Sequence, residues 1–99
     1  MKTEESQRLP ENIRKNGFDY TQVRRGQRSF VFRQHATPKL DYYEVFLIKI
    51  RPAGEVFGKW QPAKERFPGN EDFGNWAWSY STIEAAMQKY EELEQREEL

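Results

Sequence analysis

The sequence predicts an α+β domain, in which a curved antiparallel sheet of four to five strands carries a C-terminal amphipathic helix packed on one face. Apolar residues alternate with polar ones at a period of two from about residue 18 to residue 80, which is typical of strands. Glycine and proline interrupt this alternation, as short turns require. After residue 80 the apolar spacing changes to three and four residues, which indicates a helix. A run of strands followed by a helix belongs to the α+β class.

The chain of 99 residues has the length of one domain, and its composition excludes several kinds of site. We expect residues 1–8 to form a disordered polar tail and residues 9–99 to form the domain. The absence of cysteine excludes disulfides, cysteine zinc sites and thiol nucleophiles, and a single histidine excludes a multi-histidine metal site. No segment has the pattern of a signal peptide or a membrane span. We therefore expect a cytoplasmic protein with no membrane contact, cofactor or metal.

The first half of the chain predicts two strands after a short helical segment. Residues 9–16 have apolar residues four apart, a proline suited to a first helical turn and a glycine after them, so we expect one or two helical turns. Strands are expected at 18–23 and 29–34, with a tight turn at 25–27 between them. A proline that cannot donate to a strand ladder predicts a loop at 35–39.

The middle of the chain predicts three more strands. The segment 42–51 is apolar on both faces, which favours a strand inside the sheet over one at its edge. A turn at 52–54 is expected to lead into a fourth strand at 55–61. A long connection at 62–75, whose phenylalanines should anchor it to the core, then leads to a fifth strand at 76–80.

The last segment predicts a capped amphipathic helix. Ser81 and Glu84 have the spacing of a capping box, in which each side chain bonds the backbone of the other. One apolar stripe follows at helical spacing, formed by Ile83, Ala86, Met87, Tyr90 and Leu93. The acidic residues at 91–98 oppose the helix dipole, so we expect the last turn to fray.

One helix, about 10 Å wide, cannot cover five strands that lie about 4.8 Å apart. Either residues 9–16 cover the remainder, or the sheet curls, or one aromatic face stays open. An open aromatic face would be a binding surface or a dimer interface.

Charge is distributed unevenly along a chain whose net charge is zero. Residues 12–66 hold twelve lysines and arginines against five acids, whereas residues 67–99 hold two bases against eight acids. Such asymmetry favours a surface that faces a polyanion. The alternative is that the two halves attract one another, or that their solvated faces differ by chance.

An arginine cluster near the predicted tight turn is the candidate contact surface. Arginine at a projecting turn can bind phosphates or guanine edges, and aromatic residues on the same sheet can stack on bases. We therefore expect nucleic-acid contact, with DNA or RNA, through Arg24, Arg25, Arg28 and Arg33. The alternative is that these arginines are solvated edge residues that discourage strand pairing and that the rings belong to the core.

No pattern in the sequence indicates catalysis. His35 could act as a general base with Asp41 or Glu44, but their spacing matches no catalytic motif, and no phosphate-binding glycine loop or nucleophile elbow occurs. The adjacent acids Glu71 and Asp72 lack the pattern of a calcium loop. We therefore expect no catalytic residues and a protein that is not an enzyme.

Two resemblances bear on these expectations. The segments RFPGNEDFG (66–74), WAW (76–78) and STIEAA (81–86) resemble a small family of uncharacterised bacterial proteins, and this resemblance implies no activity. The strand followed by a helix that begins Ser/Thr-x-Glu-Ala-Ala is similar to plant ethylene-responsive and phage-integrase arm-type DNA-binding domains, which read DNA with the sheet. The long connection at 62–75 departs from that second pattern.

The sequence thus predicts a small non-catalytic binding module that contacts nucleic acid through a basic sheet and hairpin surface. The alternative is a protein-interaction module or a homodimeric structural protein that uses an uncovered aromatic sheet face.

Overall fold

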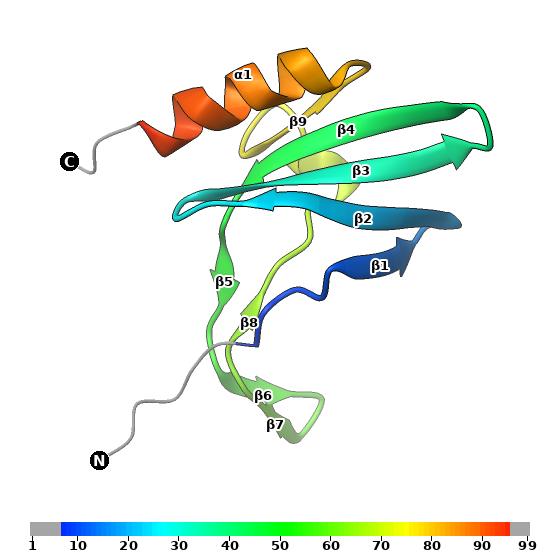
Figure 1. Ribbon diagram of the computed structural model, residues 1–99. Coiled ribbons are helices and arrows are strands. Elements are labelled where there is room, and N and C mark those ends of the chain that lie inside the picture. Colours follow the sequence, from blue (N-terminus) through cyan, green and yellow to red (C-terminus); the bar gives the residue numbers. More distant parts are fainter. Residues whose placement is uncertain (1–6, 96–99) are drawn as a thin grey trace.

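The computed structural model describes residues 7–95 and shows a five-stranded antiparallel sheet with a C-terminal helix packed on it, which confirms the predicted fold class (Figure 1). The main sheet contains, in spatial order, β1 (Asn12–Lys15), β2 (Phe18–Arg25), β3 (Ser29–Thr37), β4 (Leu40–Leu47) and β9 (Ala77–Tyr80). The strand predicted at 42–51 lies inside the sheet through residue 47, because β4 pairs with both β3 and β9. Its predicted end is wrong, because residues 50 and 51 pair in a separate two-stranded sheet.

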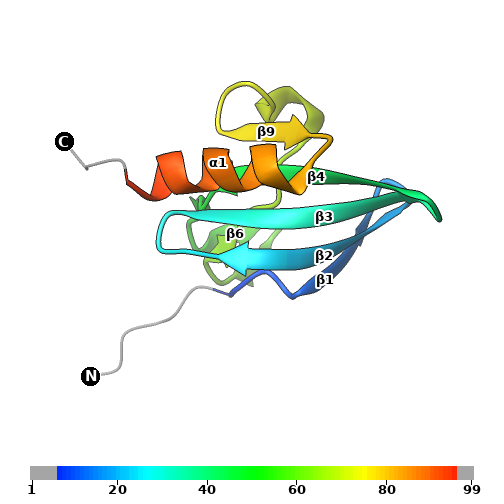
Figure 2. The ribbon, with the colours of Figure 1, turned by 45° about the horizontal axis from the view of Figure 1, so that its top comes forward.

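The helix α1 (Ile83–Glu94) lies across β3 and β4 and covers one face of the main sheet (Figure 2). Its buried stripe matches the prediction: Ala86, Tyr90 and Leu93 pack against Val31 of β3 and Val45 of β4. Burial of this stripe holds a helix that would be marginal in water by itself. Within residues 7–95, no helix is long and apolar enough to cross a membrane.

The helix cap lies one residue further along the chain than predicted. Thr82, and not Ser81, is the N-cap, and its hydroxyl accepts a hydrogen bond from the backbone N–H of Ala85 at 3.2 Å. Serine and threonine both cap helices well, so a Ser-Thr pair offers two caps that the sequence pattern does not separate.

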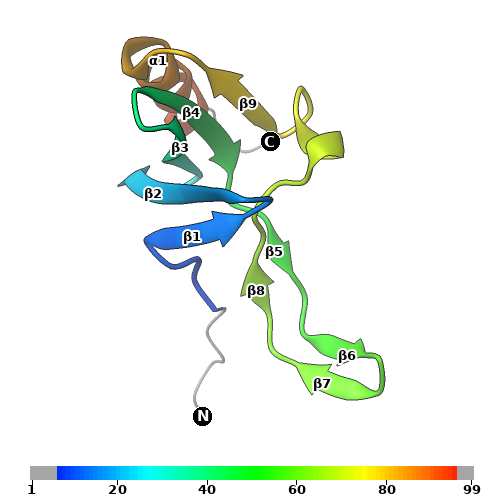
Figure 3. The same cartoon turned by 90° about the vertical axis from the view of Figure 1, so that its right-hand side faces the viewer.

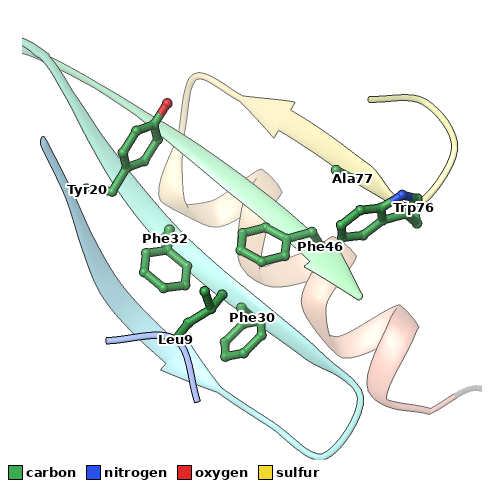
Figure 4. Close-up of a cluster of buried hydrophobic side chains, with 7 residues drawn as sticks. All are labelled: Leu9, Tyr20, Phe30, Phe32, Phe46, Trp76 and Ala77. Atoms are coloured by element: carbon green, nitrogen blue, oxygen red, sulfur yellow. The ribbon is translucent and has the colours of Figure 1, made fainter. Parts of the chain in front are cut away.

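The opposite face of the sheet carries an aromatic core (Figure 4). Phe30, Phe32 and Phe46 are fully buried, and their ring centroids lie 5.2–5.7 Å apart. This face is not open. Leu9 covers it from the segment before β1, and Trp76 covers it from the segment before β9.

The connection at 62–75 completes this cover. Phe67 packs edge-on against Phe46 with ring centroids 5.2 Å apart, and Phe73 also packs on the aromatic core. Both residues therefore anchor the connection, as predicted. The connection contains a short strand, β8 (Lys64–Glu65), and a 3₁₀ turn, η1 (Asn70–Asp72).

A two-stranded ribbon at residues 50–65, which we call the arm, projects from the main sheet on the side away from α1 (Figures 1 and 3). At its base β5 (Ile50–Arg51) pairs with β8, and at its end β6 (Gly54–Val56) pairs with β7 (Lys59–Gln61). The single strand predicted at 55–61 is wrong, because the chain reverses at Phe57 (φ 52°) and Gly58 (φ 80°). Positive φ at two central residues is typical of a type I′ hairpin turn, and a phenylalanine there gives no signal in the sequence.

The helical turns predicted at 9–16 are also wrong, because this segment contains β1. The chain turns into β2 at Asn16 (φ 54°) and Gly17 (φ 82°). Asn-Gly is a strong two-residue hairpin signal, and it outweighs the four-residue apolar spacing that suggested a helix. The loop predicted at 35–39 is shorter than expected, since β3 continues through Thr37.

Glu94 joins the end of α1 to the turn between β2 and β3. Its carboxylate accepts hydrogen bonds from the backbone N–H groups of Gln27 (2.9 Å) and Arg28 (3.0 Å) and from the hydroxyl of Ser29 (2.6 Å). Burial alone would raise the pKa of Glu94, but these hydrogen bonds outweigh it and lower the pKa. A Cβ added at Gly26 would collide with this carboxylate, so a larger residue there would displace the Glu94 side chain.

The predictions for the two chain ends are tested only in part. Of the predicted tail at 1–8, residues 1–6 lie outside the described residues, as do residues 96–99 of the acidic C-terminus. Gln7 is already paired with β8, since its N–H donates to Ala63 (2.8 Å) and its carbonyl accepts from Glu65 (2.9 Å).

An ion pair between Arg25 and Glu65 fixes the arm to the main sheet. Two guanidinium nitrogens of Arg25 lie 2.9 and 2.5 Å from the two carboxylate oxygens of Glu65, whose side chain is only 4% exposed. The backbone N–H of Leu9 donates to the same carboxylate at 2.9 Å. The pair therefore joins β2, β8 and the segment before β1 at one point.

We predict that Arg25→Met lowers the free energy of unfolding by about 3 kcal/mol at neutral pH, because it leaves a buried carboxylate without its cation. The matched control is Arg14→Met, which removes an exposed pair with Asp19 and should cost less than about 1 kcal/mol. Urea denaturation followed by tryptophan fluorescence measures both values. Equal costs for the two variants would contradict this role of Arg25.

Candidate functional site

A groove of about 520 Å³ lies between β1 and the base of the arm. We call it the basic groove, because five of its lining residues are cationic: Arg14, Lys15, Arg51, Lys64 and Arg66. The other lining residues are Leu9, Pro10, Asn12, Ile13, Glu65 and Phe67. The groove thus combines positive charge with an apolar surface.

Strand pairing brings these cations together from distant parts of the sequence. Arg14 and Lys15 end β1, and the pairing of β5 with β8 sets Arg51 opposite Lys64. Arg66 follows directly after β8. Glu65 joins the segment before β1 to the arm base, and the cations of β1 and of the arm base line one groove.

Aromatic rings and backbone carbonyls position several of these side chains. The ammonium group of Lys15 lies 5.1 Å from the ring centroid of Phe67, and the guanidinium of Arg66 lies 5.3 Å from that of Trp76. Arg51 donates to the carbonyl of Pro62 at 3.2 Å, while its buried Nε has no hydrogen-bond partner among the described residues. An orphaned guanidinium N–H is the kind of donor that an anionic ligand satisfies.

The acidic residue in the groove does not cancel its positive charge. Burial alone would raise the pKa of Glu65, but the hydrogen bonds from Arg25 and Leu9 outweigh it and lower the pKa. Glu65 is therefore ionised at neutral pH, and its charge is matched by Arg25, which lies outside the groove lining. Two of the five lining cations also have acidic partners outside the lining, since Arg14 pairs with Asp19 at 2.9 Å and Arg66 lies 3.9 Å from Asp72. Within the lining itself, cations outnumber the single acid.

A second cavity, of about 270 Å³, lies on the aromatic face, and we call it the Glu44 cavity. It is lined by Asn16, Phe18, Tyr20, Gln34, Glu44, Phe67, Pro68, Asn70 and Phe73. Glu44 is only 7% exposed, and its Oε1 has no hydrogen-bond partner in the described part of the chain. Burial raises the pKa of Glu44 to about 7, and the charge of Lys15 opposes this shift only in part.

Tyr20 and Gln34 add polar groups to this cavity. The side-chain amide of Gln34 donates to the hydroxyl oxygen of Tyr20 at 2.8 Å. Burial, together with the nearby charge of Glu44, raises the pKa of Tyr20. The Tyr20 hydroxyl therefore keeps its proton at neutral pH and can donate it to a ligand.

The arginines predicted to contact nucleic acid do not form one surface. Residues next to each other on a strand point to opposite faces. Accordingly, Arg24 lies over Tyr90 of α1 (5.6 Å), whereas Arg25 lies over Phe30 on the aromatic face (4.8 Å) and binds Glu65. Whether Arg24 and Arg25 also contact a ligand is not tested by this arrangement and stays a prediction.

Of the other two predicted arginines, one lies in a turn and one shares the helix-covered face with Arg24. Arg28 is in the turn between β2 and β3, where its backbone N–H donates to Glu94. Arg33 lies over Tyr43 at 5.6 Å, and its Nε is 3.7 Å from Asp41. Their contact with nucleic acid likewise stays a prediction.

His35, which the sequence offered as a general base, contacts two polar side chains at the exposed end of the helix-covered face. Its Nδ1 lies 3.3 Å from Asp41, and its Nε2 lies 3.0 Å from the hydroxyl of Thr21. The Thr21 hydroxyl also lies 3.3 Å from the side-chain oxygen of Asn12, so Asn12 and His35 are alternative acceptors for its single proton. The structure thus pairs His35 with Asp41, whereas Glu44 lies on the other face.

Sequence reasoning missed the basic groove as a site. Its cations were counted in the charge asymmetry, but they are spread from Arg14 to Arg66, and only the pairing of the strands unites them. A signal for Glu44 existed, because this glutamate interrupts the apolar strand 42–51. A buried carboxylate in such a position is often functional.

No protein-family model matches the chain, and comparisons with curated proteins and with solved structures gave no significant match. The function is therefore argued from the two cavities themselves.

We predict that Glu44→Gln stabilises the protein most at high pH. In the folded protein the pKa of Glu44 is about 7, above the 4.5 expected in the unfolded chain, so ionisation of Glu44 destabilises the fold progressively between these pH values. The variant should gain about 3 kcal/mol near pH 8 and almost nothing near pH 4.5.

Chemical denaturation of both proteins across this pH range measures the difference. The matched control is Glu71→Gln, because Glu71 is an exposed glutamate of η1. If the free energy of unfolding gained by Glu44→Gln does not change with pH, the pKa of Glu44 is not raised in the folded protein.

Proposed function

We propose that this protein is a nucleic-acid-binding module, and that its basic groove holds the phosphate backbone of a single strand. The observation that carries the proposal is the set of five cations that line one groove, whose acidic lining residue, Glu65, is already paired with Arg25. Arginine and lysine neutralise phosphates and release condensed counterions, which supplies most of the affinity of non-specific binding.

The apolar part of the groove favours a single strand over a duplex. Leu9, Ile13 and Phe67 line the groove beside the cations. The outside of a duplex presents mainly phosphates and sugars, whereas a single strand also presents unpaired bases that pack on apolar and aromatic side chains.

The arm, whose base borders the groove, carries exposed aromatic rings towards its end. Phe57 at its tip is fully exposed, and Trp60 is 63% exposed. A bulky residue with positive φ is a costly conformation, which suggests a role outside the fold. Rings on a projecting ribbon are suited to stack on the bases of a strand that leaves the groove.

This proposal keeps the nucleic-acid ligand expected from the sequence and places it on other residues. Arg24 and Arg33 lie on the helix-covered face, whereas the groove lies at β1 and the arm base. The two candidate surfaces can therefore be tested separately.

We predict that the double variant Arg14→Glu/Lys64→Glu binds a fluorescent single-stranded 12-mer at least about tenfold more weakly than the unchanged protein at low salt. The slope of log affinity against log salt should fall by about 1.4, because two phosphate contacts are lost. Fluorescence anisotropy with DNA and RNA oligonucleotides at several salt concentrations measures both quantities.

The matched control is Arg24→Glu/Arg33→Glu, which changes the net charge equally on the other face. This control variant should bind the single-stranded oligonucleotide with most of the affinity of the unchanged protein. If this control loses the affinity and the groove variant keeps it, the helix-covered face is the interface. If the unchanged protein binds neither DNA nor RNA at low salt, the proposed function is wrong.

The exposed aromatics of the arm support a second candidate function, a protein-interaction module or homodimer. Exposed aromatic rings at a loop tip are common at protein interfaces. Under this alternative, sedimentation velocity should show association that rises with protein concentration, depends little on salt and disappears in Phe57→Ser/Trp60→Ser. Under the proposed function, the protein stays monomeric without nucleic acid, and this variant weakens only oligonucleotide binding.

A further inference from the structure

We propose that the Glu44 cavity receives one guanine base of the strand held in the basic groove. This inference rests on the proposed function and adds a base preference to it. The carboxylate of Glu44 would accept from the two adjacent N–H groups on the Watson–Crick edge of guanine.

The first argument is the unmet hydrogen-bonding capacity of Glu44. More than nine-tenths of its surface is buried, it lines the cavity, and its Oε1 has no hydrogen-bond partner among residues 7–95. Buried polar atoms in proteins are nearly always paired, so an orphaned carboxylate oxygen in a cavity marks a place for a donor from a ligand.

The second argument is the shape and lining of the cavity. Its volume of about 270 Å³ is slightly below the range of about 300–1,000 Å³ typical of drug-sized ligands, which suits a single base. Phe18, Phe67 and Phe73 line it and offer rings on which a planar base can stack. The hydroxyl of Tyr20 supplies a donor for the guanine carbonyl oxygen, which lies beside the two N–H groups.

Electrostatics favour a neutral ligand with N–H donors over a cation. Lys15 lies over Phe67, and its charge already acts on Glu44. Lys15 would therefore repel an ammonium or guanidinium ligand at this carboxylate. Guanine supplies two N–H donors and carries no charge.

The two sites adjoin each other. Phe67 lines both the basic groove and the Glu44 cavity, and Lys15 of the groove acts on Glu44. A strand whose phosphates occupy the groove can therefore direct one base past Phe67 into the cavity.

The test uses four thymine 12-mers that differ at one central position, which is guanine, hypoxanthine, adenine or thymine. Hypoxanthine lacks the exocyclic amine and so presents only one of the two donors. At about pH 8, where the Glu44 carboxyl is mainly ionised, the guanine oligonucleotide should bind about 10- to 100-fold more tightly than the adenine one. The hypoxanthine oligonucleotide should lie between them.

Glu44→Gln should remove this preference and shift it towards adenine, because a glutamine amide matches the donor and acceptor edge of adenine. The salt dependence of binding should be unchanged, since the groove cations remain. Glu71→Gln is the matched control and should keep the preference for guanine. A merely structural role of Glu44 would change all four affinities equally.

The outcomes separate the two proposals. If all four oligonucleotides bind with equal affinity and a steep salt dependence, the proposed function stands and the guanine site is wrong. If a guanine preference persists in Glu44→Gln, the base is read elsewhere and the site is also wrong. If none of the four binds, both proposals fail.

Discussion

The ion pair between Arg25 and Glu65 is the interaction on which the rest of the arrangement depends. The buried carboxylate of Glu65 binds the guanidinium of β2 and the backbone N–H of Leu9, while its own backbone pairs with Gln7. A buried charge is tolerated only when it is paired and hydrogen-bonded, so these contacts form together. They set β1 beside the base of the arm, and the basic groove is the space that remains between them.

Two buried glutamates, Glu65 in β8 and Glu44 in β4, have opposite effects on the stability of the fold. Glu65 has a cation and two kinds of hydrogen-bond donor, and its pKa is lowered even though burial acts in the other direction. Glu44 has no such partner within residues 7–95, and burial raises its pKa to about 7. The first glutamate strengthens the fold. Ionisation of Glu44 lowers the stability of the fold near neutral pH. Such a loss of stability is typical of a carboxylate that binds a ligand.

Local patterns predicted the parts of the fold that depend on local physics. The stripe of α1 and the aromatic alternation of β2, β3 and β9 followed from periodicity. The hairpin at Phe57 did not, because the fold imposes positive φ on a residue that rarely adopts it. The candidate site was equally non-local: the groove cations come from both ends of a long stretch of sequence, whereas neighbouring arginines such as Arg24 and Arg25 point to opposite faces.

The most direct test of the account is to map oligonucleotide binding on the backbone amides by two-dimensional NMR. Addition of a guanine-containing single strand should shift the amide signals of β1, of the arm base and of residues 66–73, which surround the basic groove and the Glu44 cavity. The signals of α1 and of the turn between β2 and β3 should stay in place. Shifts confined to α1 and that turn, or no shifts at low salt, would contradict the assignment of function to the groove.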